Sequence, residues 1–168
     1  MSELLYITSE IISGIKFDII VSQTGVRKIL INKGSVDSSG MEKVTSQNLV
    51  VSNVFDQLKE YFDGKRREFS LLLDMIGTDF QKRVWNELLK ISYGETISYK
   101  QLALNLGDIK SIRAAATANG ANPLPIVIPC HRVIGSDGNL VGYGGGLDVK
   151  QKLLELEGSW SLSLFRKS

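Results

Sequence analysis

The chain has 168 residues, of which 43% are hydrophobic and 23% are charged, and its formal net charge is +2. These values describe an ordinary globular protein, long enough to bury one core or two small ones. No apolar run has the length of a membrane span, and the first ten residues, MSELLYITSE, carry acidic residues where a signal peptide has a basic region. We therefore expect a cytoplasmic protein with no membrane partner.

The chain contains one cysteine and one histidine, and they are neighbours, Cys130 and His131. One cysteine cannot form an internal disulfide, and one Cys with one His cannot supply the usual four ligands of structural zinc. We expect no metal site. Acidic and basic residues nearly balance in the first part of the chain, and the positive excess lies in the second part, which would suit a polyanionic ligand.

The N-terminal part predicts a small antiparallel sheet followed by a helix. Three β-branched, apolar-rich runs, LLYITSE, IKFDIIVS and VRKILIN, are separated by Gly-containing breaks. The polar stretch NKGSVDSSGMEK is predicted to be a surface loop. Apolar residues then recur at helical spacing from Val50 to Phe62, and Asp63-Gly64 ends the helix. A short FSLLLD segment leads to the second part.

From Gly77 onward the pattern is helical. Thr78 with Gln81 predicts a capping box in front of a core helix, and Ser98 with Gln101 predicts a second box that opens SYKQLALNLG. After a turn, SIRAAATANGA is a further candidate helix, which NPLP stops. Two short helices joined by a tight turn indicate a helix-turn-helix, and an αα-hairpin without any nucleic acid is an equally good interpretation of the pattern alone.

The second of these helices has few side chains that could read bases. Alanines and one threonine make it nearly bare, and Arg113 and Asn119 are its larger polar residues. A bare helix suits a shallow fit against the minor groove, where shape and phosphate contacts dominate. The alternative is a helix packed in the core. The single long cation, Arg113, favours DNA because it could fill a gap in the base stack.

The Cys130-His131 pair suggests a thiol nucleophile with an imidazole base. Such a base works best when a carboxylate orients it, and Glu157 is the candidate, at the end of the helix predicted for DVKQKLLELEG. A buried apolar cysteine, a structural histidine and a solvated glutamate are the competing interpretations. The glycine cluster GYGGG could bring backbone N–H donors close to a planar ligand, or it could be a flexible linker.

Several motifs together resemble a known family. IPCHRV, with NPLP upstream and GYGGGL downstream, is similar to the O6-alkylguanine-DNA alkyltransferases of the bacterial and archaeal single-chain type, and FQKRVW, ISYKQLA, IRAA and LLELEG extend the similarity from about Thr78 to Gly158. The resemblance implies an α+β protein with an N-terminal ribonuclease-H-like domain over residues 1–75. Residues 76–168 would form a C-terminal, winged-helix-like helix-turn-helix domain that carries the active-site cysteine.

The resemblance also implies roles for individual residues. Cys130 would accept the alkyl group, His131 would be its water-bridged base, and Glu157 would orient that base. Tyr99 would help to rotate the nucleotide and would hydrogen-bond the departing guanine, and Asn122 would brace the helix-turn-helix. The DNA-binding residues would be Ser98, Tyr99, Arg113, Ala114, Ala115, Ala116 and Asn119, and the base pocket would be formed by Pro125, Val133, Tyr143, Gly144 and Gly145.

Two positions depart from the family pattern. Ala116 replaces a glycine that lies close to the DNA backbone, and Gly144 stands where several relatives have serine. We expect a slightly looser DNA fit from the first and a roomier pocket from the second.

The implied activity is the irreversible, single-turnover transfer of an alkyl group from O6-alkylguanine, and also from O4-alkylthymine, in duplex DNA after base flipping. No cofactor is implied, the partner is double-stranded DNA with alkylated bases, and a monomer is expected. A Cys-His-Glu hydrolase and a protein that binds alkylated bases without repairing them are the alternatives.

Overall fold

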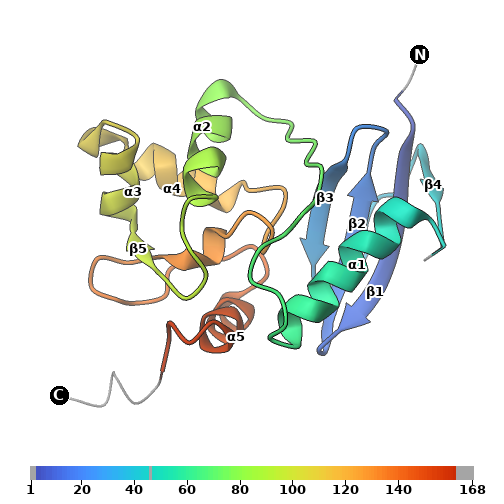
Figure 1. The fold of residues 1–168 in the computed structure, drawn as a ribbon. Coiled ribbons are helices and arrows are strands. Elements are labelled where there is room, and N and C mark those ends of the chain that lie inside the picture. The colour runs from blue at the N-terminus through green and yellow to red at the C-terminus, as the bar shows by residue number, and fades with distance from the viewer. Residues whose placement is uncertain (1–2, 46, 162–168) are drawn as a thin grey trace. The chain divides into compact units, whose positions relative to one another are not determined.

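The computed structural model describes residues 3–45 and 47–161, and the chain divides into two compact units between Ile76 and Gly77. The sequence placed this boundary one residue earlier. The first unit is a small sheet with a helix and the second is mainly helical (Figure 1), so the predicted α+β class is confirmed.

The first unit is a four-stranded sheet in the order β3-β2-β1-β4. Its strands β1 (Leu5–Ile12), β2 (Ile15–Val21) and β3 (Val26–Ile31) pair antiparallel, as the three apolar runs predict. Helix α1 (Leu49–Phe62), capped by the side chain of Asn48, lies on one face of the sheet (Figure 1). Fully buried residues of β2 and α1, Phe17, Ile19, Val54 and Leu58, form the core of this unit.

One prediction for this unit is wrong. Residues Met41–Lys43, which we expected in a surface loop, form strand β4, and this strand pairs parallel with β1. The strand has only three residues and two of them are charged and exposed, so it has neither the length nor the alternation that identifies a strand from sequence. It forms because the edge of β1 offers unpaired backbone groups.

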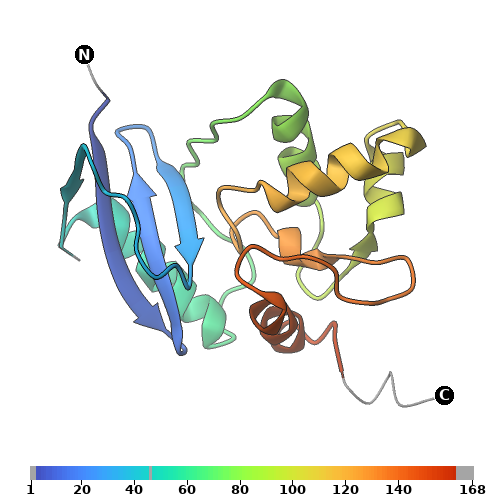
Figure 2. The same ribbon diagram turned by 180° about the vertical axis from the view of Figure 1, so that it is seen from behind.

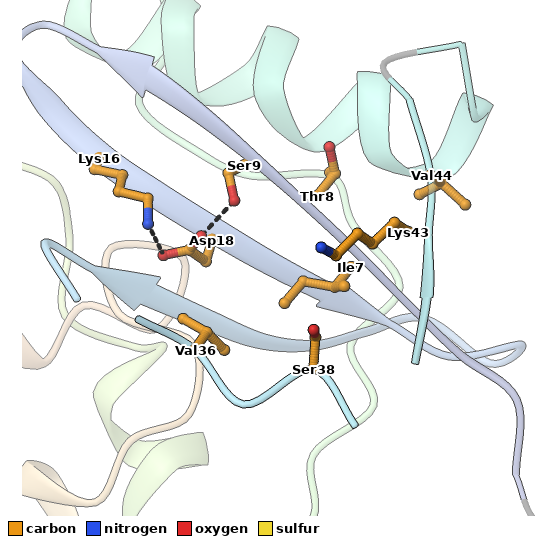
Figure 3. Close-up of a pocket in the computed structure, with 9 residues that line it drawn as sticks. All are labelled: Ile7, Thr8, Ser9, Lys16, Asp18, Val36, Ser38, Lys43 and Val44. Atoms are coloured by element: carbon orange, nitrogen blue, oxygen red, sulfur yellow. Dashed lines mark hydrogen bonds and ion pairs between the residues drawn. The ribbon is translucent and has the colours of Figure 1, made fainter. Parts of the chain in front are cut away.

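The opposite face of the sheet carries a polar pocket. The connection between β3 and β4 crosses this face (Figure 2), and a pocket of about 360 Å³ lies there. Its centre is Asp18, whose carboxylate accepts a hydrogen bond from Ser9 and lies 3.3 Å from the ammonium nitrogen of Lys16 (Figure 3). The Asp18 side chain is 3% exposed, but that of Lys16 is 38% exposed. The buried carboxylate therefore has a partner that reaches solvent.

The second unit contains four helices and a two-stranded parallel sheet in its described residues. The helices are α2 (Asp79–Leu88), α3 (Tyr99–Asn105), α4 (Ile112–Gly120) and α5 (Leu147–Leu156), and the strands are β5 (Ile97–Ser98) and β6 (Val133–Ile134). Short 3₁₀ turns, Ile109–Ser111 and Cys130–Arg132, precede α4 and β6. The sequence predicted all four helices.

The two predicted capping boxes differ in the structure. Thr78 and Gln81 form the complete, reciprocal box at the start of α2. At the start of α3 only half of the box forms, because Ser98 accepts from the backbone of Gln101 while the Gln101 side chain hydrogen-bonds Asn105 instead. Both helices still begin where the sequence placed them, because one side-chain acceptor satisfies part of the first turn.

Candidate active site

Helix α4 packs through its small residues. Ala115 and Ala118 are buried, and the indole N–H of Trp85 in α2 donates to the carbonyl of Ala118 at 2.9 Å. A residue with only a methyl side chain allows this close approach of two helices. Arg113, Ala114 and Thr117 are exposed on the other side, and Ala116 is half-buried. The exposed side of α4 is thus smooth, with Arg113 as its one long side chain.

Two residues assigned to the DNA-binding surface do not lie on it. Ala115 is completely buried and Asn119 is 4% exposed, so neither can contact DNA in this structure. The amide of Asn119 instead points toward the active-site segment, with its nitrogen 3.5 Å from the carbonyl oxygen of Cys130. The prediction was wrong for these two residues because the sequence does not fix which side of a short, alanine-rich helix faces the core.

The segment between α4 and Cys130 is held by Asn122. Its side-chain nitrogen donates to the carbonyl of Ile128 at 2.8 Å, and its side-chain oxygen accepts from the backbone N–H of Leu124 at 2.9 Å. Between them the buried Ile126 adopts φ = +75°, in the left-handed region that a β-branched residue rarely enters. Such a conformation costs about 1–3 kcal/mol and persists only where surrounding contacts impose it. Asn122 supplies two of those contacts.

Cys130 and His131 lie in the 3₁₀ turn that follows Pro129. Cys130 is 5% exposed and His131 is completely buried. Burial raises the pKa of the Cys130 thiol to about 11, although a hydrogen bond from Asn122 and the charge of Lys150 oppose the rise. The thiol is therefore protonated at neutral pH, and it can act as a nucleophile only if a base takes its proton.

The structure brings together His131 and Glu157, two residues that the sequence assigned to one site. Nε2 of His131 lies 2.8 Å from Oε1 of Glu157, and both side chains are fully enclosed. Glu157 is the residue that ends α5. The other ring nitrogen, Nδ1, has no hydrogen-bond partner among the described residues, so no direct bond joins it to the thiol. Burial lowers the pKa of His131, and this outweighs the attraction of Glu157 for the charged ring.

Lys150, on α5, holds the loop that follows β6. Its completely buried ammonium group donates to the carbonyls of Val133 at 2.6 Å, Val141 at 2.9 Å and Gly142 at 3.4 Å. Burial lowers the pKa of Lys150 to about 8, while a negative charge on Cys130 would raise it. The lysine thus fixes the loop and adds positive potential close to the sulfur.

Tyr99 and Tyr143 lie near the same sulfur. Burial raises the pKa of both phenols, and a charge on Cys130 would raise each further. The hydroxyl of Tyr99 donates to the carbonyl of Val141 at 3.2 Å. That of Tyr143 is buried with no hydrogen-bond partner in the described part of the chain. A substrate that uses the Tyr99 hydroxyl must therefore displace Val141 from it.

The other residues assigned to the pocket and to DNA surround this centre with differing exposure. Val133 is buried in β6, Pro125 is half-buried, and Ser98 caps α3. Gly144 is exposed, and a Cβ built there would meet no heavy atom within 4 Å. A side chain at that position would enter open space, and the expectation that glycine at 144 gives a roomier pocket stays a prediction. Gly145 is half-buried.

The sequence did not identify two residues of the centre, Lys150 and Arg132. Both are cations, and charged residues are rarely fully buried, so each would ordinarily be assigned to the surface. The available signals were weak: Lys150 shares the buried side of α5 with Val149, Leu153 and Leu154, and Arg132 follows the Cys-His pair directly.

No helix in residues 3–45 and 47–161 is long and apolar enough to cross a membrane. No group of three or more His, Cys, Asp or Glu side chains there could hold a metal ion.

Known proteins resemble this chain in sequence and in structure. The methylated-DNA--protein-cysteine methyltransferase of Mycobacterium bovis is 55% identical over 108 residues, which cover 64% of this chain and 66% of that protein. The O6-methylguanine methyltransferase of Mycobacterium tuberculosis superimposes with a TM-score of 0.84 at 38% identity, over 96% of this chain and 99% of that one. A structure of the M. tuberculosis protein in complex with DNA matches with the same TM-score, over 92% and 93%.

Two domain models of one family match successive parts of the chain. The DNA-binding domain of 6-O-methylguanine DNA methyltransferase matches residues 79–159, and the ribonuclease-like domain of the same family matches residues 16–75. The two matches correspond to the two compact units. The chain therefore belongs to the 6-O-methylguanine DNA methyltransferase family.

Proposed function

We propose that the protein reverses DNA alkylation by moving the alkyl group of O6-alkylguanine onto its own Cys130. The observation that carries the proposal is the enclosed pair of His131 and Glu157, which directs one ring nitrogen to the carboxylate and leaves Nδ1 without a hydrogen-bond partner among the described residues, on the residue next to the protonated thiol of Cys130. A water between Nδ1 and the thiol would connect base and nucleophile. The relatives named above support this activity.

The reaction is one displacement at the alkyl carbon. Nδ1 of His131 takes the thiol proton through the bridging water, the Sγ–C bond forms, and the C–O6 bond breaks. The electron pair of the broken bond stays on guanine, which accepts a proton or hydrogen bond from the hydroxyl of Tyr99. The product is a thioether with no carbonyl for water to attack, so each molecule reacts once.

DNA would be bound by the exposed side of α4 in the minor groove. Arg113 and Ala114 would face the duplex, Ala116 would lie at the edge of the contact, and the damaged nucleotide would be flipped into the pocket beside Cys130. Because few side chains there can read bases, binding is independent of sequence and weakens with salt. We also infer that O4-alkylthymine is a substrate and that the protein acts as a monomer.

Mass spectrometry of the intact protein tests the proposal. After incubation with a duplex that holds one O6-methylguanine, the protein should gain the mass of one methyl group in place of hydrogen, once, on Cys130. The variant Cys130→Ala has no thiol at all and should bind the duplex without gaining mass. Repeated turnover would identify a hydrolase instead, and DNA binding without a mass gain in the wild type would identify a protein that only recognises the lesion.

A further inference from the structure

Arg132 is buried beside the His131–Glu157 pair, and none of the roles described above uses it. Its side chain is 7% exposed. Nε donates to Oε2 of Glu157 at 2.8 Å, and one terminal nitrogen donates to Oε1 at 2.9 Å. The other terminal nitrogen donates to the carbonyl of Ile91 at 2.6 Å, and the guanidinium carbon lies 5.8 Å from the centre of the Tyr93 ring. A planar fork of this kind fixes a carboxylate in both position and rotation.

Hydrogen bonds reach both carboxylate oxygens of Glu157. Oε1 accepts from His131 and Arg132, and Oε2 accepts from Arg132 and, at 3.3 Å, from the backbone N–H of Gly94. Burial alone would raise the pKa of Glu157, but the hydrogen bonds from His131 and Arg132 and their charges lower it to about 2. The carboxylate is therefore ionised and can only accept, so Nε2 of His131 must carry the proton.

We propose that Arg132 is a positioning residue for His131: by binding both oxygens of Glu157 it locks the carboxylate on Nε2, and Nδ1 is left as the lone pair that serves Cys130. This proposal rests on the proposed function for its purpose, but the tautomer that it fixes is a property of the free protein. Arg132 also shares the negative charge of Glu157, which would otherwise favour a permanently charged ring unable to act as a base.

The titratable and charged groups around His131 come from α5 and from the 3₁₀ turn that contains the histidine. Glu157 and Lys150 belong to the end and the body of α5, and Arg132 and Cys130 belong to the same turn as the histidine. Both cations lower the pKa of His131, and Glu157 raises it. The buried residues of α2, which also packs against this turn, are apolar. Removal of Arg132 should consequently shift the balance toward the charged ring.

The chain offers a direct experiment because His131 is its only histidine. Protein labelled with ¹⁵N-histidine gives ring signals from this residue alone, so its tautomer and pKa can be read by NMR without DNA. The wild type should show a neutral ring with its proton on Nε2. In Arg132→Met the ring pKa should rise by about one unit or more, because an opposing charge is lost. Methyl transfer should then fall most steeply at the acidic end of its pH profile.

Arg132→Lys keeps the charge but loses the fork, and it covers the case in which the Met variant does not fold. Its ring pKa should stay near that of the wild type, while the single Nε2–H tautomer gives way to a mixture and transfer slows at least several-fold. Arg83→Met removes an exposed arginine of α2 and serves as the control, with unchanged ring signals.

Two results would overturn the role of Arg132. One is a wild-type tautomer together with a wild-type transfer rate in Arg132→Lys. The other is an unchanged ring pKa in a folded Met variant. If the wild-type protein does not transfer methyl groups, the proposed function fails. The NMR signals of the His131 ring still decide whether Arg132 sets the tautomer.

Discussion

Each unit of the molecule buries one carboxylate with a basic partner, and the two differ in how the partner is enclosed. In the first unit Asp18 pairs with Lys16, whose side chain is 38% exposed and reaches the pocket of Figure 3. In the second unit Glu157 meets His131 and Arg132, and none of the three side chains is more than 7% exposed. Water can reach the partner of the first carboxylate but not those of the second, so the charges of the second cluster act on one another with less screening.

The largest effect should come from removing the charge of each carboxylate. Glu157→Gln leaves the buried guanidinium of Arg132 without its counter-ion, and we expect a loss of about 3–5 kcal/mol in the free energy of unfolding of the second unit. Asp18→Asn keeps an acceptor for Ser9 and leaves an accessible Lys16, so the first unit should lose only about 0–1 kcal/mol.

The two units can be followed separately in this experiment. Both tryptophans, Trp85 and Trp160, belong to the second unit, so their fluorescence during denaturation reports Glu157→Gln. Hydrogen exchange of the central strand β2 reports Asp18→Asn. Equal losses in the two variants would show that enclosure of the partner does not set the strength of these clusters.

Acid should destabilise the second unit through the same residue. The pKa of Glu157 is lowered from 4.5 to about 2 in the folded protein. Because the folded value lies below the unfolded one, its contribution is complete above pH 4.5 and disappears as the pH falls from 4.5 toward 2. A shift of this size corresponds to about 3 kcal/mol. Denaturation followed by tryptophan fluorescence at several pH values measures it. Glu157→Gln should lack this dependence, and a wild type that lacks it too would place the carboxylate outside the ion cluster.

The sequence predicts the parts of this fold that local patterns determine. The antiparallel strands follow from β-branched, apolar-rich runs, α1 ends at Asp63, and α2 begins at the capping box of Thr78. Strand β4 was missed because its pairing depends on an edge elsewhere in the sheet. The buried side of α4 could not be assigned because alanine fits either environment, and this led to the errors at Ala115 and Asn119.

The residues of the candidate site also divide into those that local sequence indicates and those that it does not. Cys130, His131 and Glu157 were assigned to the candidate site from chemistry and motif, because a thiol, an imidazole and a carboxylate are the residues that such a reaction needs. Lys150 and Arg132 were missed because their burial is compensated by backbone carbonyls of Val133, Val141 and Ile91, which come from other parts of the chain. No local pattern reports that a carbonyl will face a cation.

Arg113 is the exposed counterpart of Arg132, and it should affect function without affecting stability. If its side chain fills the space left by a flipped nucleotide, Arg113→Ala should slow repair of duplex DNA by roughly ten-fold or more, equivalent to about 1.4 kcal/mol. Reaction with a free base such as O6-benzylguanine, which needs no flipping, should stay nearly unchanged, and a single-stranded substrate should fall between. An equal loss of both activities, with a lowered unfolding midpoint, would make Arg113 a residue that stabilises the fold.

The smallest effect is expected in the loop before α5, at glycines where an added side chain would meet no other heavy atom. At Gly144 a Cβ meets no heavy atom within 4 Å, and the backbone does not adopt a positive φ. Gly144→Ser should therefore change the free energy of unfolding by no more than about 0.5 kcal/mol. Gly146, two residues later, has φ = +93°, so Gly146→Ser should cost about 1 kcal/mol although its side chain would also meet open space. Urea denaturation followed by tryptophan fluorescence compares the free energies of unfolding of the two variants directly. If Gly144→Ser were the more destabilising of the two, position 144 would be packed against other residues in solution. This part of the loop would then be enclosed, as Glu157, His131 and Arg132 are.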